Sequence, residues 1–354
     1  MNAFLDGHAV GNLITNFQFS SHAMSNWVNK MRLTLQVRRI YADCSELVEQ
    51  TVCNRECQYM TLSITPGNQE NSDFAGVVTG IDIANGVSTA VAHEIEEAID
   101  HYAVLVFPDQ KINDNQQFTF SSHFGPMEQA TGDVVALDQR RLSMQVNDIS
   151  NLDKDGNVLG RDDRTRLFGL GNMLWHSDSS FKTVPARYSL LSARVIPAAG
   201  GSTQFADMRA AWDKLDTELQ NEAKELVCQH SQLFSRSSLG FEDFTDAQRR
   251  EWQPVMQRLV RRHPRSKRLS LFLSAHIGAI NDWPVPEARL YIRDLTEHAT
   301  QPEFVYTHVW KPWDLVMWDN RSTMHRARRY DHTQPRDLHR TTVSDELSSL
   351  DCAI

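Results

Sequence analysis

A histidine and an aspartate two residues apart, His176 and Asp178, are the first side chains in this sequence that could do chemistry together. If this stretch is a strand, residues i and i+2 point to the same face, so the imidazole and the carboxylate converge. Together they would supply two thirds of the 2-His-1-carboxylate facial triad, which holds non-haem Fe(II) with open positions. The same pair also arises by chance, and it is then a hydrogen-bonded pair at the protein surface.

A third ligand is available in the C-terminal part of the chain. His325 follows an apolar segment at 314–318, which we predict to be a buried strand, and a turn. Arg336 and Arg340 come next, and their side chains share one face if the chain between them is extended. Arginine suits bidentate recognition of carboxylates, so this face could hold two small anions beside a metal. The alternative is a solvated basic stretch that includes the other arginines of this segment.

The elements that must position these side chains are many short strands and a few helices. Apolar residues at i, i+4 and i+8 predict a helix over 90–102, capped by Ser88. Further helices are expected at 113–124, from Asp207 to about 226, and at 284–297, with strands at 60–64, 104–107, 188–195, 269–273, 303–309 and 314–318. Because the strands do not alternate regularly with helices, the pattern favours a mainly β fold with helical additions, such as a jelly roll.

The composition is that of a globular protein and excludes several function classes. The 354 residues carry a net charge of −9, which argues against a nucleic-acid partner because such binding needs a basic footprint. The mean hydropathy is −0.45, and no apolar run approaches the roughly 18–20 residues that a membrane span requires. A basic segment followed by an apolar block is missing from the first thirty residues, so we predict a cytoplasmic protein with no membrane partner. The sequence leaves a homo-oligomer open.

The first part of the chain differs from the rest. Residues 1–59 hold three of the five cysteines and show no clear alternation of strands and turns. We therefore expect the compact domain to span residues 60–354, with 1–59 as an extension of uncertain order or the product of a mis-assigned start. The scattered cysteines are interpreted as reduced thiols, because their number is odd and their spacing does not suggest a disulfide framework.

A set of motifs in a fixed order resembles a known family over roughly residues 60–345. The motifs are Trp175-His176-Ser177-Asp178, Gly200-Gly201-Ser202-Thr203, Trp318-Asp319-Asn320, His325, Arg336 and Arg340. The sequence is similar to the Fe(II)/2-oxoglutarate-dependent dioxygenases of the taurine and 2,4-dichlorophenoxyacetate dioxygenase family, and most similar to the phenoxyacetate branch. The resemblance implies a double-stranded β-helix core, which is a cupin-like jelly roll.

The resemblance also implies a role for each motif residue. The iron ligands would be His176, Asp178 and His325, and the groups that bind 2-oxoglutarate would be Thr203, Trp318 and Arg336. Arg340 matches the position that binds the acidic end of the primary substrate. His276 either lines the substrate pocket or is a hydrogen-bonded structural histidine.

The implied reaction uses Fe(II), O₂ and 2-oxoglutarate, which becomes succinate and CO₂. The substrate would be a phenoxyalkanoate-type ether acid like 2,4-dichlorophenoxyacetate, and its hydroxylation would give a phenol and a 2-oxo acid. One alternative is the same chemistry on a sulfonate or another small carboxylate. Another is a jelly-roll binding module that has lost turnover, although the intact His176, Asp178 and His325 argue against it.

Overall fold

The structure is a computed structural model, and it describes residues 62–354 except 70, 132–133 and 353. The predicted extension over 1–59 and the predicted domain start at Met60 lie outside the described residues.

Short strands provide most of the regular structure. They are β1 (Ser63–Pro66), β2 (Gly76–Thr79), β3 (Val104–Phe107), β4 (Asn147–Asp148), β5 (Ala186–Val195), β6 (Thr203–Asp207), β7 (Val227–His230), β8 (Val255–Arg258), β9 (Val260–Arg262), β10 (Leu269–Leu271), β11 (Ile277–Ile280), β12 (Val305–His308), β13 (Leu315–Asp319), β14 (Thr323–Ala327) and β15 (Asp337–Ser344).

Helices lie mainly between and outside the strands. They are α2 (Thr89–Tyr102), α3 (Asp114–Ser122), α4 (Arg164–Gly169), α5 (Met208–Asp213), α6 (Thr217–Glu225), α7 (Gln232–Ser237), α8 (Asp246–Glu251) and α9 (Val285–Ala299). Single 3-10 turns are η1 (Ile83–Asn85), η2 (Leu137–Gln139), η3 (Leu170–Met173), η4 (Pro302–Phe304) and η5 (Ser349–Asp351).

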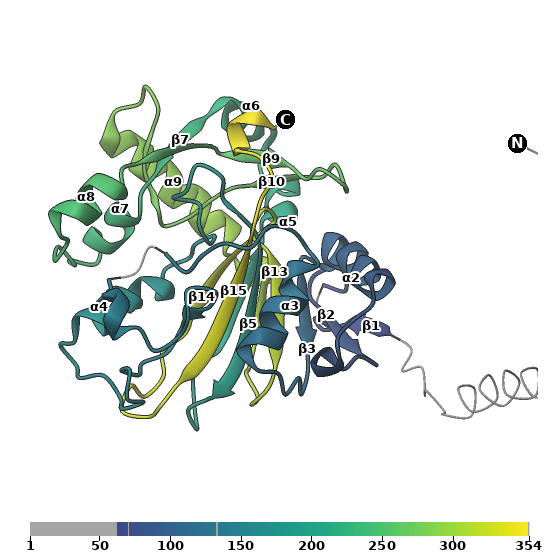
Figure 1. The fold of residues 1–354 in the computed structure, drawn as a ribbon. Coiled ribbons are helices and arrows are strands. Elements are labelled where there is room, and N and C mark those ends of the chain that lie inside the picture. The colour runs from purple at the N-terminus through teal and green to yellow at the C-terminus, as the bar shows by residue number, and fades with distance from the viewer. Residues whose placement is uncertain (1–61, 70, 132–133, 353) are drawn as a thin grey trace, which may run out of the picture. The chain divides into compact units, whose positions relative to one another are not determined.

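The strands form one large sheet and three small ones. The large sheet has seven strands in the order β1-β2-β3-β13-β5-β15-β4, and a three-stranded sheet has the order β12-β6-β14. Their pairs are antiparallel except for β2 with β3. The other sheets are β11-β7-β8 and β10-β9, which lie at the end of the large sheet that is uppermost in Figure 1. This arrangement agrees with the predicted β core with helical additions.

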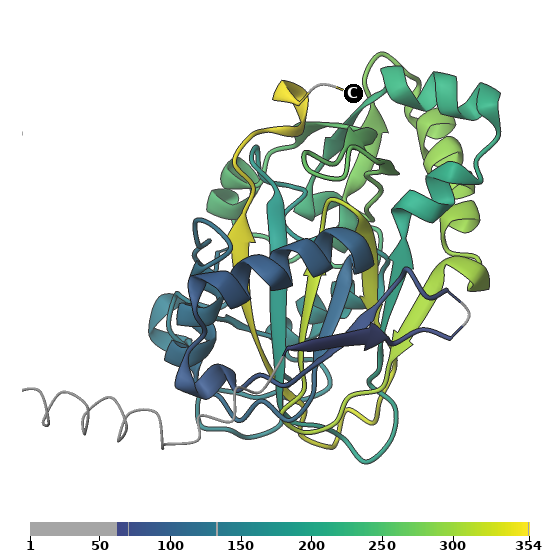
Figure 2. The same cartoon turned by 90° about the vertical axis from the view of Figure 1, so that its right-hand side faces the viewer.

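Both faces of the large sheet are covered, as β13 shows. Val316 and Trp318 pack with Phe205 of β6 in the core between the large sheet and the β12-β6-β14 sheet. Leu315 and Met317 point to the opposite face and pack in the core beneath α2 and α3. Figure 2 shows α2, in blue, crossing in front of this face. A strand buried on both faces reads as a continuous apolar run, which is why 314–318 could be predicted from the sequence.

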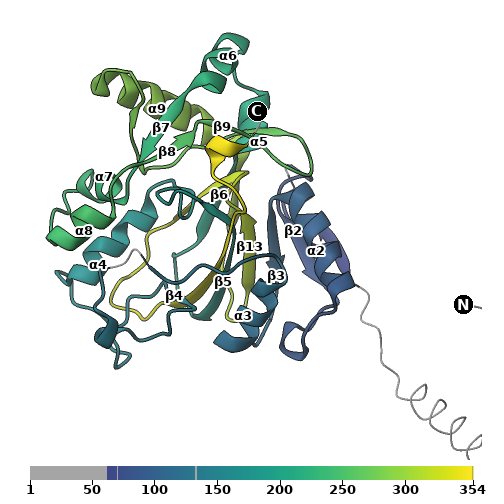
Figure 3. The same ribbon diagram turned by 45° about the horizontal axis from the view of Figure 1, so that its top comes forward.

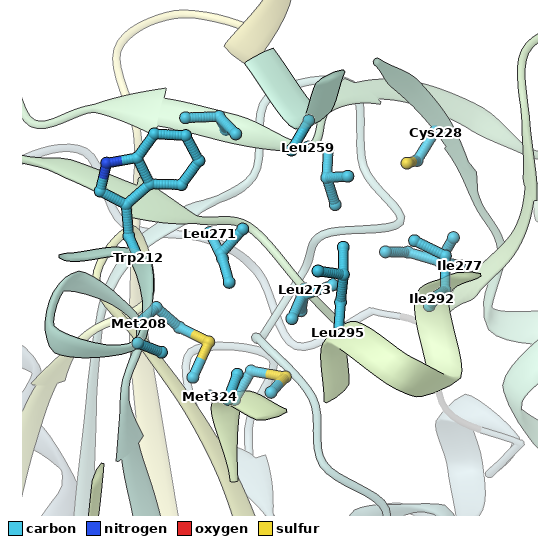
Figure 4. Packing of buried hydrophobic residues seen from close by; sticks show 14 of the residues in the cluster. Met208, Trp212, Cys228, Leu259, Leu271, Leu273, Ile277, Ile292, Leu295 and Met324 are labelled. Carbon is cyan, nitrogen blue, oxygen red and sulfur yellow. The ribbon is translucent and has the colours of Figure 1, made fainter. Parts of the chain in front are cut away.

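A separate core joins the small sheets to α5, α6 and α9. Met208 of α5 and Met324 of β14 meet Leu295 of α9 there, and Leu271 and Leu273 fill the space between the helices and strands (Figure 4). This core fixes the segment that carries β14 against the body of the domain.

The helices predicted at 90–102, 113–124 and 284–297 agree with α2, α3 and α9, whereas the short helices α4, α7 and α8 were not predicted. The Ser88 side chain accepts a hydrogen bond from the Val91 N–H at 3.3 Å, as predicted for the cap of α2. Asn113 caps α3 with a reciprocal capping box. The single helix expected from Asp207 to about 226 is wrong, because Asp216 accepts a hydrogen bond from the Glu218 N–H and begins a new helix, α6.

The helices and the cysteines bear on two of the predictions made from composition. Among the residues that the structure describes, no helix is long and apolar enough to cross a membrane. Cys228 and Cys352 are free thiols, and Cys228 is buried.

Candidate active site

The side chains of His176, Asp178 and His325 meet inside the domain. His176 and His325 of β14 are joined by an antiparallel bridge, in which their backbone N–H groups donate to each other's carbonyl oxygens at 3.0 and 2.8 Å. Asp178 lies between the two rings, 3.8 Å from His176 Nε2 and 3.7 Å from His325 Nε2. One ligand atom from each residue lies within 4.8 Å of the others, and all three side chains are buried. The alternative of a surface pair is therefore wrong.

The strand expected at 176–178 is also wrong. His176 forms only the single bridge to β14, and Asp178 lies in the turn that follows it. Hydrogen bonds set the direction of the Asp178 side chain instead. Ser189 Oγ donates to Asp178 Oδ2 at 2.7 Å, and the Asp178 N–H donates to Asn320 Oδ1 at 3.0 Å. Asn320 Nδ2 donates to Ser189 Oγ at 3.0 Å, so the three groups form a closed buried network.

The protonation states of the three side chains suit metal binding. His176 Nδ1 lies 2.7 Å from the Leu174 carbonyl oxygen, which can only accept, so Nδ1 carries the proton and Nε2 keeps its lone pair. Burial lowers the pKa of His176, and it lowers that of His325 still further with help from the neighbouring His176 charge. Burial alone would raise the pKa of Asp178, but Arg340 and the two histidines outweigh it and hold this pKa below its ordinary value. Two neutral imidazoles and a carboxylate are ligands for a divalent metal.

Packing also orients the His325 ring. It lies 4.7 Å from the Trp318 ring and 6.0 Å from the Phe205 ring, centroid to centroid. Trp318 is fully buried, and its Nε1–H donates to Asn320 Oδ1 at 3.0 Å. Trp318 therefore supports two parts of the site, although it is not among the described residues that line the adjacent cavity.

A cavity of about 430 Å³ opens beside this cluster. Its polar lining includes His176, Asp178, Arg236, His276, Arg336 and Arg340, and its apolar lining includes Leu142, Leu159, Phe168, Leu170, Met173 and Phe181. In Figures 1 and 3, α4 and α7 lie on the side of β5 away from α2, and both helices contribute to the lining. A cavity with an apolar part and several convergent cations suits an apolar molecule with an acidic end.

Arg336 is a buried cation with no carboxylate beside it. Its side chain donates only to the carbonyl oxygens of Ile149 and Gly201, both at 3.4 Å, and no ion pair joins it to the described acidic residues. Gly201 has a φ of +72°, and a Cβ there would lie 3.4 Å from Arg336 Nε. Burying a charge without a partner is costly, so the site fits a bound anion. The alternative of a solvated basic stretch is wrong for this residue, which is 5% exposed.

Arg340, on β15, contacts the predicted metal cluster directly. Its Nη1 donates to Asp178 Oδ1, and its Nε is buried without a hydrogen-bond partner among the described residues. Thr203 lies on β6, where its hydroxyl oxygen accepts from Trp310 Nε1 at 3.0 Å. Thr203 does not line the cavity in the described part of the chain, so its predicted role toward 2-oxoglutarate stays a prediction.

Both interpretations of His276 hold. The residue lines the cavity, and its ring packs 4.8 Å from Phe181. Its Nδ1 also lies 2.9 Å from Ser235 Oγ, which donates to the Gln232 carbonyl oxygen and therefore accepts from His276. Burial lowers the pKa of His276 far below its ordinary value, so the ring is neutral.

A second group, formed by the half-buried Asp100 and the buried His263 and Asp319, also has three potential ligand atoms close together. Arg321 Nη2 lies 2.8 Å from Asp319 Oδ2, and Arg265 Nε lies 2.6 Å from Asp100 Oδ2. Because guanidinium groups already neutralise both carboxylates, this group is a structural ion-pair network.

A β sandwich that holds two neutral histidines and a carboxylate beside buried arginines defines a metal-dependent enzyme for small anions. The family model described as "Taurine catabolism dioxygenase TauD, TfdA family" matches residues 64–342, and the chain belongs to this family. The membership confirms the predicted jelly roll and the predicted class, a dioxygenase that uses Fe(II), 2-oxoglutarate and O₂.

Individual relatives are similar over most of their length. Alpha-ketoglutarate-dependent 2,4-dichlorophenoxyacetate dioxygenase of Cupriavidus pinatubonensis is 45% identical over 276 residues, which cover 77% of this chain and 95% of that protein. (S)-phenoxypropionate/alpha-ketoglutarate-dioxygenase of Sphingobium herbicidovorans is 35% identical over 79% of this chain and 94% of that protein. The crystal structure of AAD-2 in complex with Mn(II) and N-oxalylglycine is 54% identical, has a TM-score of 0.79, and is matched over 82% of this chain and 99% of that one.

Proposed function

We propose that this chain hydroxylates a phenoxyalkanoate-type ether acid, with Fe(II) held by His176, Asp178 and His325. The observation that carries the proposal is the convergence of these three buried side chains beside a cavity that has both an apolar lining and a buried cation, Arg336, which pairs with no carboxylate of the described residues. The 45% identity to a 2,4-dichlorophenoxyacetate dioxygenase supports the choice of substrate class.

When bound, the iron supplies the oxygen chemistry, in which O₂ and 2-oxoglutarate are converted so that one oxygen atom enters the substrate and the other enters succinate. Hydroxylation of the carbon between the ether oxygen and the carboxylate gives a hemiacetal, which collapses to a phenol and a 2-oxo acid. For phenoxyacetate the balance is phenoxyacetate, 2-oxoglutarate and O₂ on one side, and phenol, glyoxylate, succinate and CO₂ on the other.

The chain's own residues bind and orient the two acids. Arg336 binds the distal carboxylate of 2-oxoglutarate, because it is a buried cation that nothing in the described residues neutralises. Thr203 assists it, since the hydroxyl accepts from Trp310 and keeps its own proton to donate. Trp318 acts through His325 and Asn320.

Arg340 binds the carboxylate of the aryloxy acid, and the apolar lining receives its ring. The Arg340 Nε is a buried donor without a partner in the described part of the chain, and it belongs to a side chain that touches Asp178. An acid held there would place its reactive carbon next to the proposed metal ligands. Phe168 and Phe181, which line the same cavity, supply flat apolar surface for the ring.

A substrate panel tests this proposal. The purified chain with Fe(II), 2-oxoglutarate and O₂ is given 2,4-dichlorophenoxyacetate, 2-phenoxypropionate or taurine, and succinate and phenol are measured. We expect succinate release to be stimulated by the aryloxy acids and to match phenol formation. Stimulation by taurine alone would favour a sulfonate substrate, and no stimulation by any acid would contradict the proposal.

A further inference from the structure

Arg236, which belongs to no motif considered above, is a second buried cation without a carboxylate partner. It lies on α7 and is 6% exposed. Its Nη1 donates to Ser235 Oγ at 3.1 Å, while its Nε is buried and has no hydrogen-bond partner among the described residues. Burial, together with the nearby Arg340 charge, lowers the pKa of Arg236 to about 10, so the side chain remains a cation at neutral pH.

The guanidinium of Arg236 belongs to the same cavity as the proposed metal ligands. It lines that cavity with His176, Asp178 and Arg340. Its charge lowers the pKa of His176, and the Asp178 charge in turn raises the pKa of Arg236, although neither effect is as large as that of burial. Arg236 and Arg340 therefore line one cavity and each has a buried Nε–H donor without a hydrogen-bond partner among the described residues. A carboxylate has two oxygens, so one carboxylate can accept from both donors.

Two residues, Phe168 and Gly171, lie against the Arg236 guanidinium. The guanidinium carbon lies 4.6 Å from the centre of the Phe168 ring. At Gly171 in η3, a Cβ would lie only 2.2 Å from Arg236 Cζ. Gly171 lies in a 3-10 helix, a backbone conformation that any residue can adopt. Glycine is therefore needed here because a larger side chain would overlap with Arg236, and not because of the backbone conformation.

We propose that Arg236 binds the carboxylate of the aryloxy acid jointly with Arg340, and that Gly171 is a specificity-determining position because it leaves room for the Arg236 guanidinium. This inference rests on the proposed function, and it adds a second anchor to the acid end of the substrate. Two cations on one carboxylate select an acid over a neutral molecule of the same shape, because a neutral ligand would leave the Arg236 charge and both buried Nε–H donors without an anionic partner.

The test compares an acid with a neutral analogue. The Mn(II)- and N-oxalylglycine-loaded protein is titrated calorimetrically with phenoxyacetate and with phenoxyacetamide, in the wild type, Arg236→Gln and Gly171→Ala. We expect both substitutions to weaken phenoxyacetate binding by about ten- to a hundredfold and to change phenoxyacetamide binding by no more than about twofold. The affinity for 2-oxoglutarate, measured separately, should stay within about twofold of wild type, because Arg336 provides that contact.

A matched control is available at Gly160, which is not among the described residues that line the cavity. A Cβ there would meet nothing within 4 Å, so Gly160→Ala should bind both ligands like the wild type. Melting temperatures show whether each variant is folded. If Arg236→Gln does not fold, Gly171→Ala still tests the inference.

The results separate the two proposals. A wild type that binds neither ligand, or binds both equally, would contradict the proposed substrate class. A wild type that prefers the acid, together with unchanged preference in Arg236→Gln and Gly171→Ala, would overturn only the role of Arg236. Equal weakening of acid and amide, or a loss confined to 2-oxoglutarate, would overturn it as well.

Discussion

Asp178 owes its position to hydrogen bonds with residues from two other parts of the fold. Ser189 lies on β5 and Asn320 follows β13, and both bond to Asp178 and to each other. Groups that hydrogen-bond to a metal ligand fix its orientation and tune its affinity. The ligands themselves were recognisable from their types and order in the sequence. Ser189 and Arg236 were not, and for the motif residue Asn320 the contact with Asp178 was not predicted, because these contacts depend on how the strands and helices pack.

The contribution of Ser189 can be measured against a serine on the same strand. Ser189→Ala removes the hydrogen bond to Asp178, so we expect metal affinity to fall by about ten- to a hundredfold. Ser192 is equally buried but lies on the opposite face of β5, and its hydroxyl has no partner among the described residues. Ser192→Ala should therefore leave metal affinity unchanged. Equal metal affinities of Ser189→Ala and Ser192→Ala would contradict a role of the Ser189 hydrogen bond in orienting Asp178.

The two arginines of the C-terminal segment should affect different ligands. Arg336→Gln removes charge-assisted bonds worth roughly 1.5–3 kcal/mol, so the apparent KM for 2-oxoglutarate should rise by about ten- to a hundredfold. Arg340→Gln should act mainly on the KM for the aryloxy acid. Because Arg340 also donates to Asp178, metal affinity is measured for the same variant. If both substitutions weaken only 2-oxoglutarate, Arg340 is not a substrate anchor.

At the scale of elements, the sequence predicted what local chemistry determines. The cap residues of α2 and α3 and the doubly buried β13 were recognisable, because each depends on neighbours in sequence. The segment at 176–178 was wrongly expected to be a strand, since its only ladder contact is with His325, far along the chain. Arg336 also lies outside a strand, because β15 begins at the next residue, Asp337. It nevertheless lines the same cavity as Arg340.

Helix α3 and strand β15 are joined by a pH-dependent contact. His339 Nδ1 lies 2.5 Å from Asp114 Oδ1, and His339 Nε2 lies 3.2 Å from Asp337 Oδ1. Burial lowers the pKa of His339, but the two carboxylates outweigh burial and raise it above its ordinary value of 6.5. The pKa of Asp114 is lowered by the bond to His339, and that of Asp337 falls to about 2 although burial opposes this.

The sign of the effect follows from these shifts. A raised histidine pKa stabilises the folded state fully below pH 6.5, and this stabilisation is lost as the pH rises through the folded-state pKa. The lowered carboxylate pKa values stabilise above pH 3.8 and lose their effect as the pH falls further. His339→Gln should therefore lower the Tm more at about pH 5.5 than at about pH 8.5. A Tm difference that is the same at both pH values would contradict this account of the contact.

At the scale of the molecule, net charge and site charge have opposite signs. The chain carries −9, which argued against a nucleic-acid partner. The cavity nevertheless contains Arg236, Arg336 and Arg340, which lack carboxylate partners other than Asp178 in the part of the chain that the structure describes. Composition averages over the surface, so affinity for small anions could be inferred only from the motif order and then from the packing.

The domain boundary gives a prediction for the whole chain. The family match begins at residue 64, close to the predicted domain start at Met60. A chain of residues 60–354 should therefore fold and turn over like the full chain. The measurement compares the Tm and the rate of succinate release of the two chains. Insoluble or inactive shortened protein would show that residues 1–59 are required.

The most direct test of the central claim is the ratio of products formed with Fe(II), 2-oxoglutarate, O₂ and 2,4-dichlorophenoxyacetate. We expect one 2,4-dichlorophenol for each succinate whose formation depends on the aryloxy acid. We also expect His176→Ala, which loses a metal ligand at an open site, to form neither product while keeping a Tm close to wild type. Succinate without the phenol, or near-wild-type turnover by His176→Ala, would contradict the account.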